Sequence, residues 1–182
     1  MKYCSNCGNT VEKKIPEDDN RLRHCCDSCG SIHYLNPKVI AGTLPFIGDK
    51  VLLCKRAIKP RYGLWTLPAG FLENGETVAQ GAFRETEEET DTQVKMGHLY
   101  AIFDIPQIYQ VYMLHLSEVV NDDFKPTSES LEVKLFTEEE IPWDDLAFPF
   151  VPTVLKNYFK DKEKGEFPLR TQTIERPVKP IS

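Results

Sequence analysis

The segment Gly70–Thr92, GFLENGETVAQGAFRETEEETDT, holds the most informative pattern of the chain. Within it Glu85, Glu88 and Glu89 occupy positions i, i+3 and i+4 of a predicted helix, so that three carboxylates share one helix face. Like charges at this spacing repel one another, and a divalent cation that prefers hard oxygen ligands, Mg²⁺ or Mn²⁺, would offset the repulsion. The spacing therefore predicts a metal site on this helix.

The net charge of the chain is concentrated in the same segment. Seven acidic residues and a single arginine between Gly70 and Asp91 leave this stretch with six negative charges, which equals the net charge of −6 of all 182 residues. A concentrated acidic patch repels bare phosphate but attracts a cation, and the cation can then recruit phosphate. A solvated helix face is the alternative explanation of such a charge run.

Local signals place the helix among several strands. Thr77 is a suitable N-cap and Gln80 completes a capping box, which predicts a helix over residues 77–90. A hairpin-type turn is predicted at residues 47–50. Strands are predicted at residues 38–46, 51–56, 98–103, 109–116 and 132–136.

The remaining segments have weaker signals. Residues 57–69 are predicted as a loop, and residues 145–159 as the last helices, interrupted by Pro149 and Pro152. From residue 166 onward the chain has three prolines and no periodicity. We expect this tail to be loosely attached or used in a partner contact.

Five of the six cysteines lie within the first 29 residues, a clustering typical of metal binding in a reducing compartment. Cys4 and Cys7 form one C-x-x-C pair, and Cys26 and Cys29 form a second pair after 18 intervening residues. Each two-residue spacer lets one tight turn supply two thiolates, and four thiolates complete the tetrahedral shell of a structural Zn²⁺. Because so small a unit cannot fold on its core alone, the metal should supply its folding energy.

Alternatives to these four ligands stay open. Cys25 could replace Cys26, and His24 and His33 lie nearby. We prefer Cys26 because its spacing repeats that of the first pair. Coincidence or a redox pair is the other explanation of the two C-x-x-C pairs.

The acidic segment resembles the Nudix box: a glycine, five residues, a glutamate, seven residues, and then R-E-U-x-E-E-x-G-U, in which U is aliphatic. Six fixed positions match at the right separations, at Gly70, Glu76, Arg84, Glu85, Glu88 and Glu89. The departures are Thr86 and Thr92 at the two aliphatic positions and Asp91 at the last glycine. Aspartate tolerates the left-handed conformation in which that glycine would end the helix.

The resemblance implies an α+β protein. We expect a zinc ribbon at residues 1–35, a Nudix α/β/α sandwich with a mixed sheet at residues 36–165, and an extended C-terminal tail at residues 166–182.

The resemblance also implies roles for particular residues. The expected catalytic residues are Arg84, Glu85, Glu88 and Glu89. Arg84 would orient a neighbouring glutamate, and Glu88 would take a proton from the attacking water. In the NADH pyrophosphatase branch further metal ligands correspond to Glu129, for which Glu132 and simple surface exposure compete, and to the carbonyl of Ala69.

Substrate binding is less readable. Arg56 corresponds to a strand residue that often faces substrate phosphate, although an exposed strand-end charge would explain it equally well. We also expect Gly70 and Trp65 to contact substrate. The aromatic residues that could stack on a base, unless they form core, are Tyr62, Trp65, Phe103, Tyr109 and Tyr112.

The ribbon joined to the Nudix segment resembles ribbon-bearing pyrophosphatases of FAD, ADP-ribose and NADH. The S-Q-P-W-P-F-P-x-S motif that marks NADH preference is absent, and residues 140–150 read EIPWDDLAFPF instead. The implied activity is Mg²⁺- or Mn²⁺-dependent hydrolysis of a pyrophosphate bond, with FAD or ADP-ribose as the expected substrate. NADH or NAD-capped RNA is the alternative substrate. The non-enzymatic alternatives are an ADP-ribose sensor and a nucleic-acid-binding ribbon on a silent Nudix scaffold.

Composition bears on partners and location. Residues 1–35 carry five acids and five bases, so a nucleic-acid partner is not expected. No stretch approaches the roughly 20 apolar residues of a membrane helix, and no secretory signal is readable, so we expect a cytoplasmic protein without a membrane partner. Dimers are common among the relatives, and a homodimer, which the tail could mediate, is a further expectation.

Overall fold

The computed structural model describes residues 1–175 of the chain, which divides into two compact units, Met1–Pro37 and Lys38–Ser182. The smaller unit contains a three-stranded antiparallel sheet in the order β1-β2-β3. Its strands are β1 (Glu12–Lys14), β2 (Arg23–Cys25) and β3 (Ile32–His33). With strands this short, little apolar surface can be buried, and the unit needs another source of stability.

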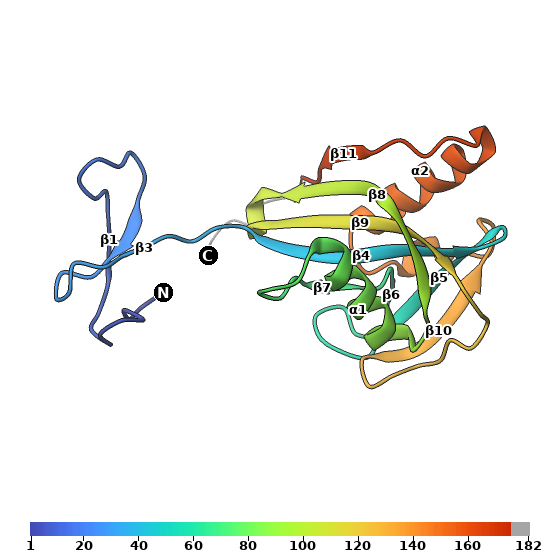
Figure 1. Ribbon diagram of the computed structural model, residues 1–182, viewed down its shortest axis with the longest axis horizontal. Helices are drawn as coiled ribbons and strands as arrows, with labels where there is room; N and C mark the ends of the chain where they lie inside the picture. The colour runs from blue at the N-terminus through green and yellow to red at the C-terminus, as the bar shows by residue number, and fades with distance from the viewer. Residues whose placement is uncertain (176–182) are drawn as a thin grey trace. The chain divides into compact units, whose positions relative to one another are not determined.

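The larger unit is built on a mixed sheet in the order β10-β5-β4-β9-β8-β11 (Figure 1). These strands are β4 (Lys38–Ile47), β5 (Lys50–Arg56), β8 (Val94–Ile105), β9 (Gln110–Val119), β10 (Ser130–Phe136) and β11 (Arg170–Thr173). Two short strands, β6 (Trp65–Thr66) and β7 (Ala69–Phe71), pair with β5 and β4. The two central strands β4 and β9 run parallel, whereas β5 and β8 pair antiparallel with them.

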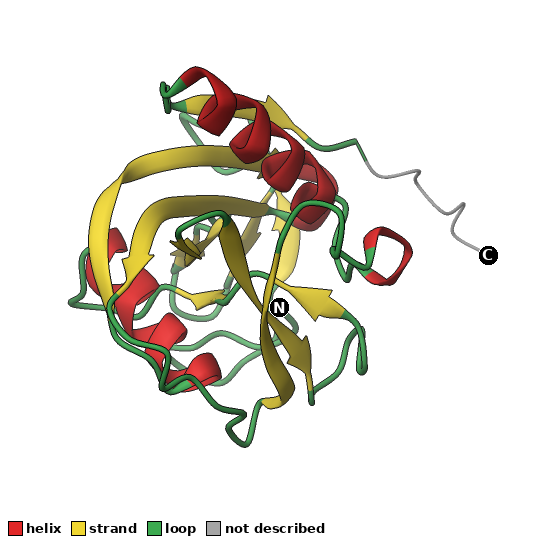
Figure 2. Cartoon of the chain, turned by 90° about the vertical axis from the view of Figure 1, so that its right-hand side faces the viewer, coloured by secondary structure: helices red, strands yellow, loops and turns green. Residues whose placement is uncertain are grey.

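Two helices, α1 (Val78–Thr90) and α2 (Phe150–Lys164), lie on opposite sides of the sheet (Figure 2). The alternation of side chains along β5 shows the two faces: Leu53 packs in the core under α2, whereas Leu52 packs in the apolar cluster under α1. Within residues 1–175 the other helical elements are two 3₁₀ turns, η1 (Pro106–Ile108) and η2 (Trp143–Asp145). The expected α+β sandwich with a mixed sheet is confirmed.

The core under α2 contains most of the large apolar side chains. Buried residues of α2 in this core are Phe150, Val151, Val154, Leu155, Tyr158 and Phe159. Fully burying one such side chain stabilises the folded state by about 1.5–3 kcal/mol relative to leaving it exposed. This packing covers the face of the sheet opposite the one on which α1 lies.

The ends of α1 follow the sequence signals. The Thr77 side chain accepts from the backbone N–H of Gln80 at 3.2 Å, and the Gln80 side chain accepts from the backbone N–H of Thr77 at 2.8 Å. At the other end Asp91 takes the left-handed conformation, with φ 48° and ψ 36°. The predicted capping box and left-handed terminus are therefore confirmed.

Three predicted segments differ from the structure: the loop at residues 57–69, the last helices and the C-terminal tail. The loop at residues 57–69 contains the short strand β6 and the start of β7, which join the sheet by pairing with distant strands. The last helix begins at Phe150 and continues past residue 159 to Lys164. Pro152 does not interrupt it, because in the first turn of a helix the missing N–H has no intrahelical partner to lose.

The expectation of a loosely attached tail is wrong for residues 170–174. β11 adds to the sheet edge in parallel with β8, with Arg170 opposite Ala101. Asp161 of α2, 1% exposed, accepts hydrogen bonds from Tyr100 Oη at 2.7 Å and from Arg170 Nε at 2.6 Å. Residues 176–182 of the predicted tail lie outside the described residues.

No helix within residues 1–175 is long and apolar enough to cross a bilayer.

We predict that Asp161→Asn lowers the free energy of unfolding at neutral pH by about 2 kcal/mol, since it weakens the charge-assisted hydrogen bonds from Tyr100 and Arg170. The Arg170 guanidinium lowers the pKa of Asp161 below its usual value. A carboxylate with a lowered folded-state pKa stabilises the protein above its unfolded pKa of about 3.9, and this contribution is lost as the pH falls further.

Urea unfolding at pH 7 and pH 3 measures this effect, with the exposed Glu163→Gln on the same helix as the control. The difference between wild type and Asp161→Asn should shrink at the lower pH. An equal difference at both pH values would contradict the prediction.

Candidate active site

A cavity of about 470 Å³ lies beside the predicted acidic face of α1. Its wall includes Glu85, Glu88 and Glu89 of the helix, together with five other residues predicted from the sequence or named as stacking candidates: Arg56, Ala69, Gly70, Tyr112 and Glu129. The structure thus brings the helix glutamates and the more distant predicted acid, Glu129, to one site.

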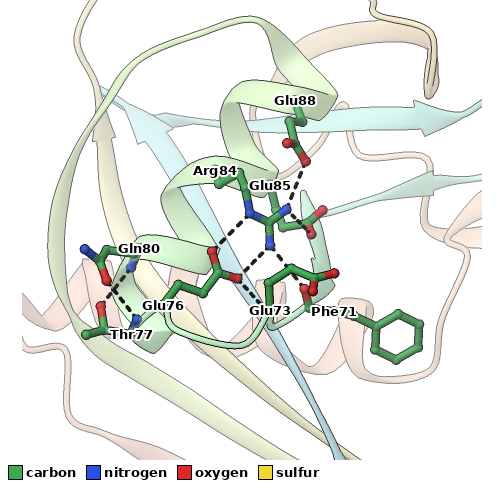
Figure 3. Close-up of polar contacts among 8 residues, drawn as sticks. All are labelled: Phe71, Glu73, Glu76, Thr77, Gln80, Arg84, Glu85 and Glu88. Atoms are coloured by element: carbon green, nitrogen blue, oxygen red, sulfur yellow. Dashed lines mark hydrogen bonds and ion pairs between the residues drawn. The ribbon is translucent and has the colours of Figure 1, made fainter.

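Arg84 organises the acidic face (Figure 3). Its guanidinium donates to Glu85 at 2.7 Å and to Glu88 at 2.9 Å through Nη1. On its other side it donates to both carboxylate oxygens of Glu76, at 2.7 and 3.1 Å, and to the carbonyl of Phe71 at 3.1 Å. Glu76 also accepts from the backbone N–H of Glu73 at 2.7 Å, so this carboxylate fixes the loop before the helix.

The three helix glutamates differ in burial. Glu89 is 5% exposed and Glu85 is 9% exposed, whereas the Glu88 side chain is 54% exposed. Burial raises the pKa of Glu89 to about 7 and also raises that of Glu85. By contrast, the Arg84 guanidinium lowers the pKa of Glu76 to about 2. The two buried glutamates of α1 and Glu76 of the preceding loop therefore lie in different electrostatic environments.

Gly70 is required by the position of Glu85. A Cβ atom at residue 70 would lie 2.1 Å from Oε2 of Glu85, which is far inside van der Waals contact. The box glycine therefore lets the carboxylate of Glu85 lie directly against the backbone of β7. This contact explains the glycine at this position on steric grounds alone.

Two departures from the Nudix pattern have partners in the structure. Thr86, at an aliphatic position of the pattern, is fully buried and its hydroxyl lies 2.7 Å from the hydroxyl of Thr43 on β4. Asp91, at the glycine position, forms an ion pair with Lys125 at 2.7 Å. Both substitutions are accommodated without disturbing the glutamates.

Arg56 forms part of the cavity wall and is only 9% exposed. Its guanidinium carbon lies 5.1 Å from the centre of the Phe148 ring, and its Nε donates to the carbonyl of Pro60 at 2.9 Å. The guanidinium of Arg56 is therefore fixed in the cavity wall by Phe148 and Pro60, and it is not an exposed charge at a strand end.

The aromatic candidates separate into core and cavity residues. Trp65 is 7% exposed and packs edge-on against Phe136, with 4.9 Å between the ring centroids. It is not among the residues that line the cavity. Its position does not support the predicted contact with substrate, because the ring fills the core. Phe103 is also core, whereas Tyr62 and Tyr109 are largely exposed.

Sequence reasoning missed several apolar residues of the cavity wall, namely Ile58, Ile108, Phe148 and Phe150. The rings of Phe148 and Phe150 stack with 6.1 Å between their centroids and an angle of 7° between their planes. The AFPF run at residues 147–150 was visible in the sequence. Its position opposite Arg56, however, depends on the folding of the chain after η2.

The ribbon brings together the four cysteines that the spacing predicted, Cys4, Cys7, Cys26 and Cys29. Their sulfur atoms lie within 4.8 Å of one another, with 3.6 Å between Cys4 and Cys29 and 3.5 Å between Cys7 and Cys26. A tetrahedron with zinc–sulfur bonds of about 2.3 Å separates its sulfurs by about 3.8 Å. The sulfur positions therefore fit one structural zinc ion.

The alternative ligands lie differently. Cys25 is buried, and its sulfur lies 3.9 Å from the backbone carbonyls of Lys14 and Arg23, outside the sulfur cluster. His33 Nε2 lies 3.2 Å from the sulfur of Cys4, where it can donate a hydrogen bond to a thiolate.

Comparison with known proteins agrees with this geometry. The family model of the NUDIX domain matches residues 37–157, and the family model of the Nudix N-terminal zinc ribbon matches residues 2–35. The chain belongs to the Nudix hydrolase family. A crystal structure of a NUDIX hydrolase from Nitrosomonas europaea is similar with a TM-score of 0.93 at 50% identity, and the match covers 97% of this chain and 100% of that one.

Relatives with named activities are more distant. An ADP-ribose pyrophosphatase from Methanocaldococcus jannaschii is 29% identical over 71% of this chain and 77% of its own length. NAD-capped RNA hydrolases from Vibrio vulnificus and from human are 28% and 31% identical, over 84% and 77% of this chain. The chain matches only 55% and 32% of the lengths of these two hydrolases.

We predict that Cys26→Ser abolishes stoichiometric zinc binding, whereas Cys25→Ser retains it, because only Cys26 belongs to the sulfur cluster. Zinc content after dialysis, measured by elemental analysis of the full chain, tests this. Zinc loss in Cys25→Ser together with retention in Cys26→Ser would reverse the ligand assignment.

Proposed function

We propose that this Nudix hydrolase is a divalent-metal-dependent pyrophosphatase that hydrolyses ADP-ribose. The observation that carries the proposal is the convergence of Glu85, Glu88 and Glu89 on one wall of a cavity that also contains a held arginine and apolar side chains. ADP-ribose is favoured because one relative, of which this chain matches 77% of the length, is an ADP-ribose pyrophosphatase. FAD belongs to the same class of substrate and remains a sequence-based expectation.

The donor set fits a hard divalent cation. The three helix glutamates offer carboxylate oxygens, and we assign Glu129 and the carbonyl of Ala69 as further ligands because both residues line the same cavity. Gly70 belongs to this arrangement, because a side chain at this position would collide with the carboxylate of Glu85. When bound, Mg²⁺ or Mn²⁺ lowers the pKa of coordinated water and neutralises charge on the phosphate oxygens.

The protein's own residues position the reacting groups. Arg84 holds the carboxylates of Glu85 and Glu88 through one nitrogen, which sets their separation. Glu88 is the most exposed of the three glutamates, and in this proposal it accepts the proton of the attacking water. Glu85 and Glu89, being buried, serve as ligands rather than as proton acceptors exchanging with solvent.

Other residues of the cavity wall would bind the rest of the substrate. Arg56 faces the cavity with its guanidinium fixed by Phe148 and by the carbonyl of Pro60, which suits it to pair with a phosphate oxygen. The apolar residues Ile108, Tyr112 and Phe148 supply a surface for the adenine ring. Cleavage of the pyrophosphate bond of ADP-ribose then yields AMP and ribose 5-phosphate.

A second candidate substrate is NADH or NAD-capped RNA. It is favoured by the match to NAD-capped RNA hydrolases over as much as 84% of this chain. Against it, the residues at 140–150 do not follow the motif associated with NADH preference. The two candidates share the cleaved bond and differ in the group beyond it.

We predict that the full chain with Mg²⁺ or Mn²⁺ cleaves ADP-ribose faster than FAD, NADH or NAD-capped RNA, because the match to the ADP-ribose pyrophosphatase covers most of both proteins. Chromatographic identification of products separates these outcomes, and samples treated with a chelator strong enough to remove free Mg²⁺ serve as the control. Faster cleavage of NADH would favour the second candidate. Binding of ADP-ribose without cleavage of any compound would favour a sensor.

We predict that Glu85→Gln and Glu88→Gln each lower kcat by about 10²- to 10⁴-fold, because each removes a charged oxygen from the metal-facing or proton-accepting set. Glu87→Gln is the matched control, since Glu87 is an exposed residue of the same helix turn. Steady-state kinetics with saturating Mg²⁺ measures the effect. Wild-type turnover in Glu85→Gln and Glu88→Gln would refute the assignment of the site.

A further inference from the structure

Strand β5 leads from the core to the cavity along one of its faces. The alternate residues Leu52, Cys54 and Arg56 share this face. Leu52 and Cys54 belong to the apolar cluster under α1, and Arg56 lines the cavity. Cys54 is therefore the residue at which that cluster meets the polar wall of the site.

Glu89 has few partners for a buried carboxylate. Within residues 1–175 its hydrogen-bond donors are the backbone N–H of Ala69 and the thiol of Cys54, and each lies 3.3 Å from Oε2. Arg84, which holds the other two helix glutamates, makes no hydrogen bond to it. A carboxylate only 5% exposed to solvent depends strongly on each remaining donor, because little solvent reaches it to replace a lost one.

The thiol of Cys54 has one proton to donate. Two acceptors lie within reach, Oε2 of Glu89 at 3.3 Å and the carbonyl of Thr66 at 3.6 Å. The carboxylate oxygen is the nearer of the two, and an ionised carboxylate is a stronger acceptor than a backbone carbonyl. Because Cys54 is 1% exposed, its thiol is shielded from external reagents and acts as a donor within the structure.

We propose that Cys54 is a positioning residue that holds Oε2 of Glu89 in the orientation required for the divalent cation. This inference rests on the proposed function, which makes Glu89 a metal ligand. The backbone of Ala69 fixes the same oxygen from a second direction. Partners of this kind behind metal ligands commonly change metal affinity or activity when they are removed.

Three variants of the full chain separate hydrogen bonding from volume. Cys54→Ser keeps a donor, whereas Cys54→Val keeps apolar volume without a donor. Val133→Ala is the packing control, because Val133 lies opposite Cys54 on β10 in the same apolar cluster and makes no hydrogen bond to Glu89. Mn²⁺ binding, followed by the electron paramagnetic resonance signal of the free ion with zinc already in the ribbon, provides a readout independent of turnover.

We predict that Cys54→Val weakens Mn²⁺ binding by about tenfold, while Cys54→Ser stays within about twofold of wild type. Thermal unfolding should rank these two variants in the opposite order, because valine suits a buried strand and a buried serine hydroxyl does not. Val133→Ala should lower the melting temperature without weakening Mn²⁺ binding. A purely structural role of Cys54 would place serine below valine in both measurements.

Wild-type Mn²⁺ affinity in Cys54→Val, or an equal loss in Cys54→Ser, would overturn the inference. So would a loss in Val133→Ala as large as that in Cys54→Val. If Cys54→Ser does not fold, the comparison of Cys54→Val with Val133→Ala still decides. A wild-type chain that neither binds Mn²⁺ nor cleaves ADP-ribose would remove the proposed function itself, whereas normal wild-type behaviour with an unaffected Cys54→Val removes only the positioning role.

Discussion

The guanidinium of Arg84 determines the arrangement on which the rest of the site depends. It contacts Glu85 and Glu88 of its own helix and Glu76 of the preceding loop, and so it neutralises part of the charge that would otherwise drive these carboxylates apart. Its hydrogen bond to the carbonyl of Phe71 also ties the helix to β7. A single planar group with five donors can satisfy these directions together, which a lysine ammonium cannot.

Much of this site was predictable because its residues are close in the sequence. The spacing of Glu85, Glu88 and Glu89 follows the helical repeat, and the capping pair Thr77 and Gln80 defines where that repeat begins. The same holds for the ribbon, in which each pair of cysteines occupies one tight turn. Strands β4, β5 and β10 were also foreseen, because their apolar runs are bounded by turn residues.

The parts that sequence did not predict depend on contacts between distant segments. Strand β11 reads RTQT, without an alternating apolar pattern, and is held by its pairing with β8 and by the ion pair of Arg170 with Asp161. Likewise Trp65 and Phe148 are both aromatic residues near glycine or proline, and only the packing decides that the first fills the core and the second faces the cavity. Local pattern specifies an element, whereas tertiary packing decides which of its side chains reach a site.

The three glutamates of α1 differ in solvent exposure because of the way in which the helix packs on the sheet. Glu89 lies over β5, where the apolar cluster ends at Cys54, while Glu88 projects from the same turn into the more open part of the cavity. A helix repeat of 3.6 residues turns adjacent side chains by about 100°, so one turn can carry a buried and an exposed carboxylate side by side. The pleat of β5 makes the matching transition, from Leu52 through Cys54 to Arg56, in steps of two residues. Glu89 of α1 contacts Cys54 of β5, where both elements pass from buried to cavity-lining residues. An acidic group at this position can therefore be buried and still line the cavity.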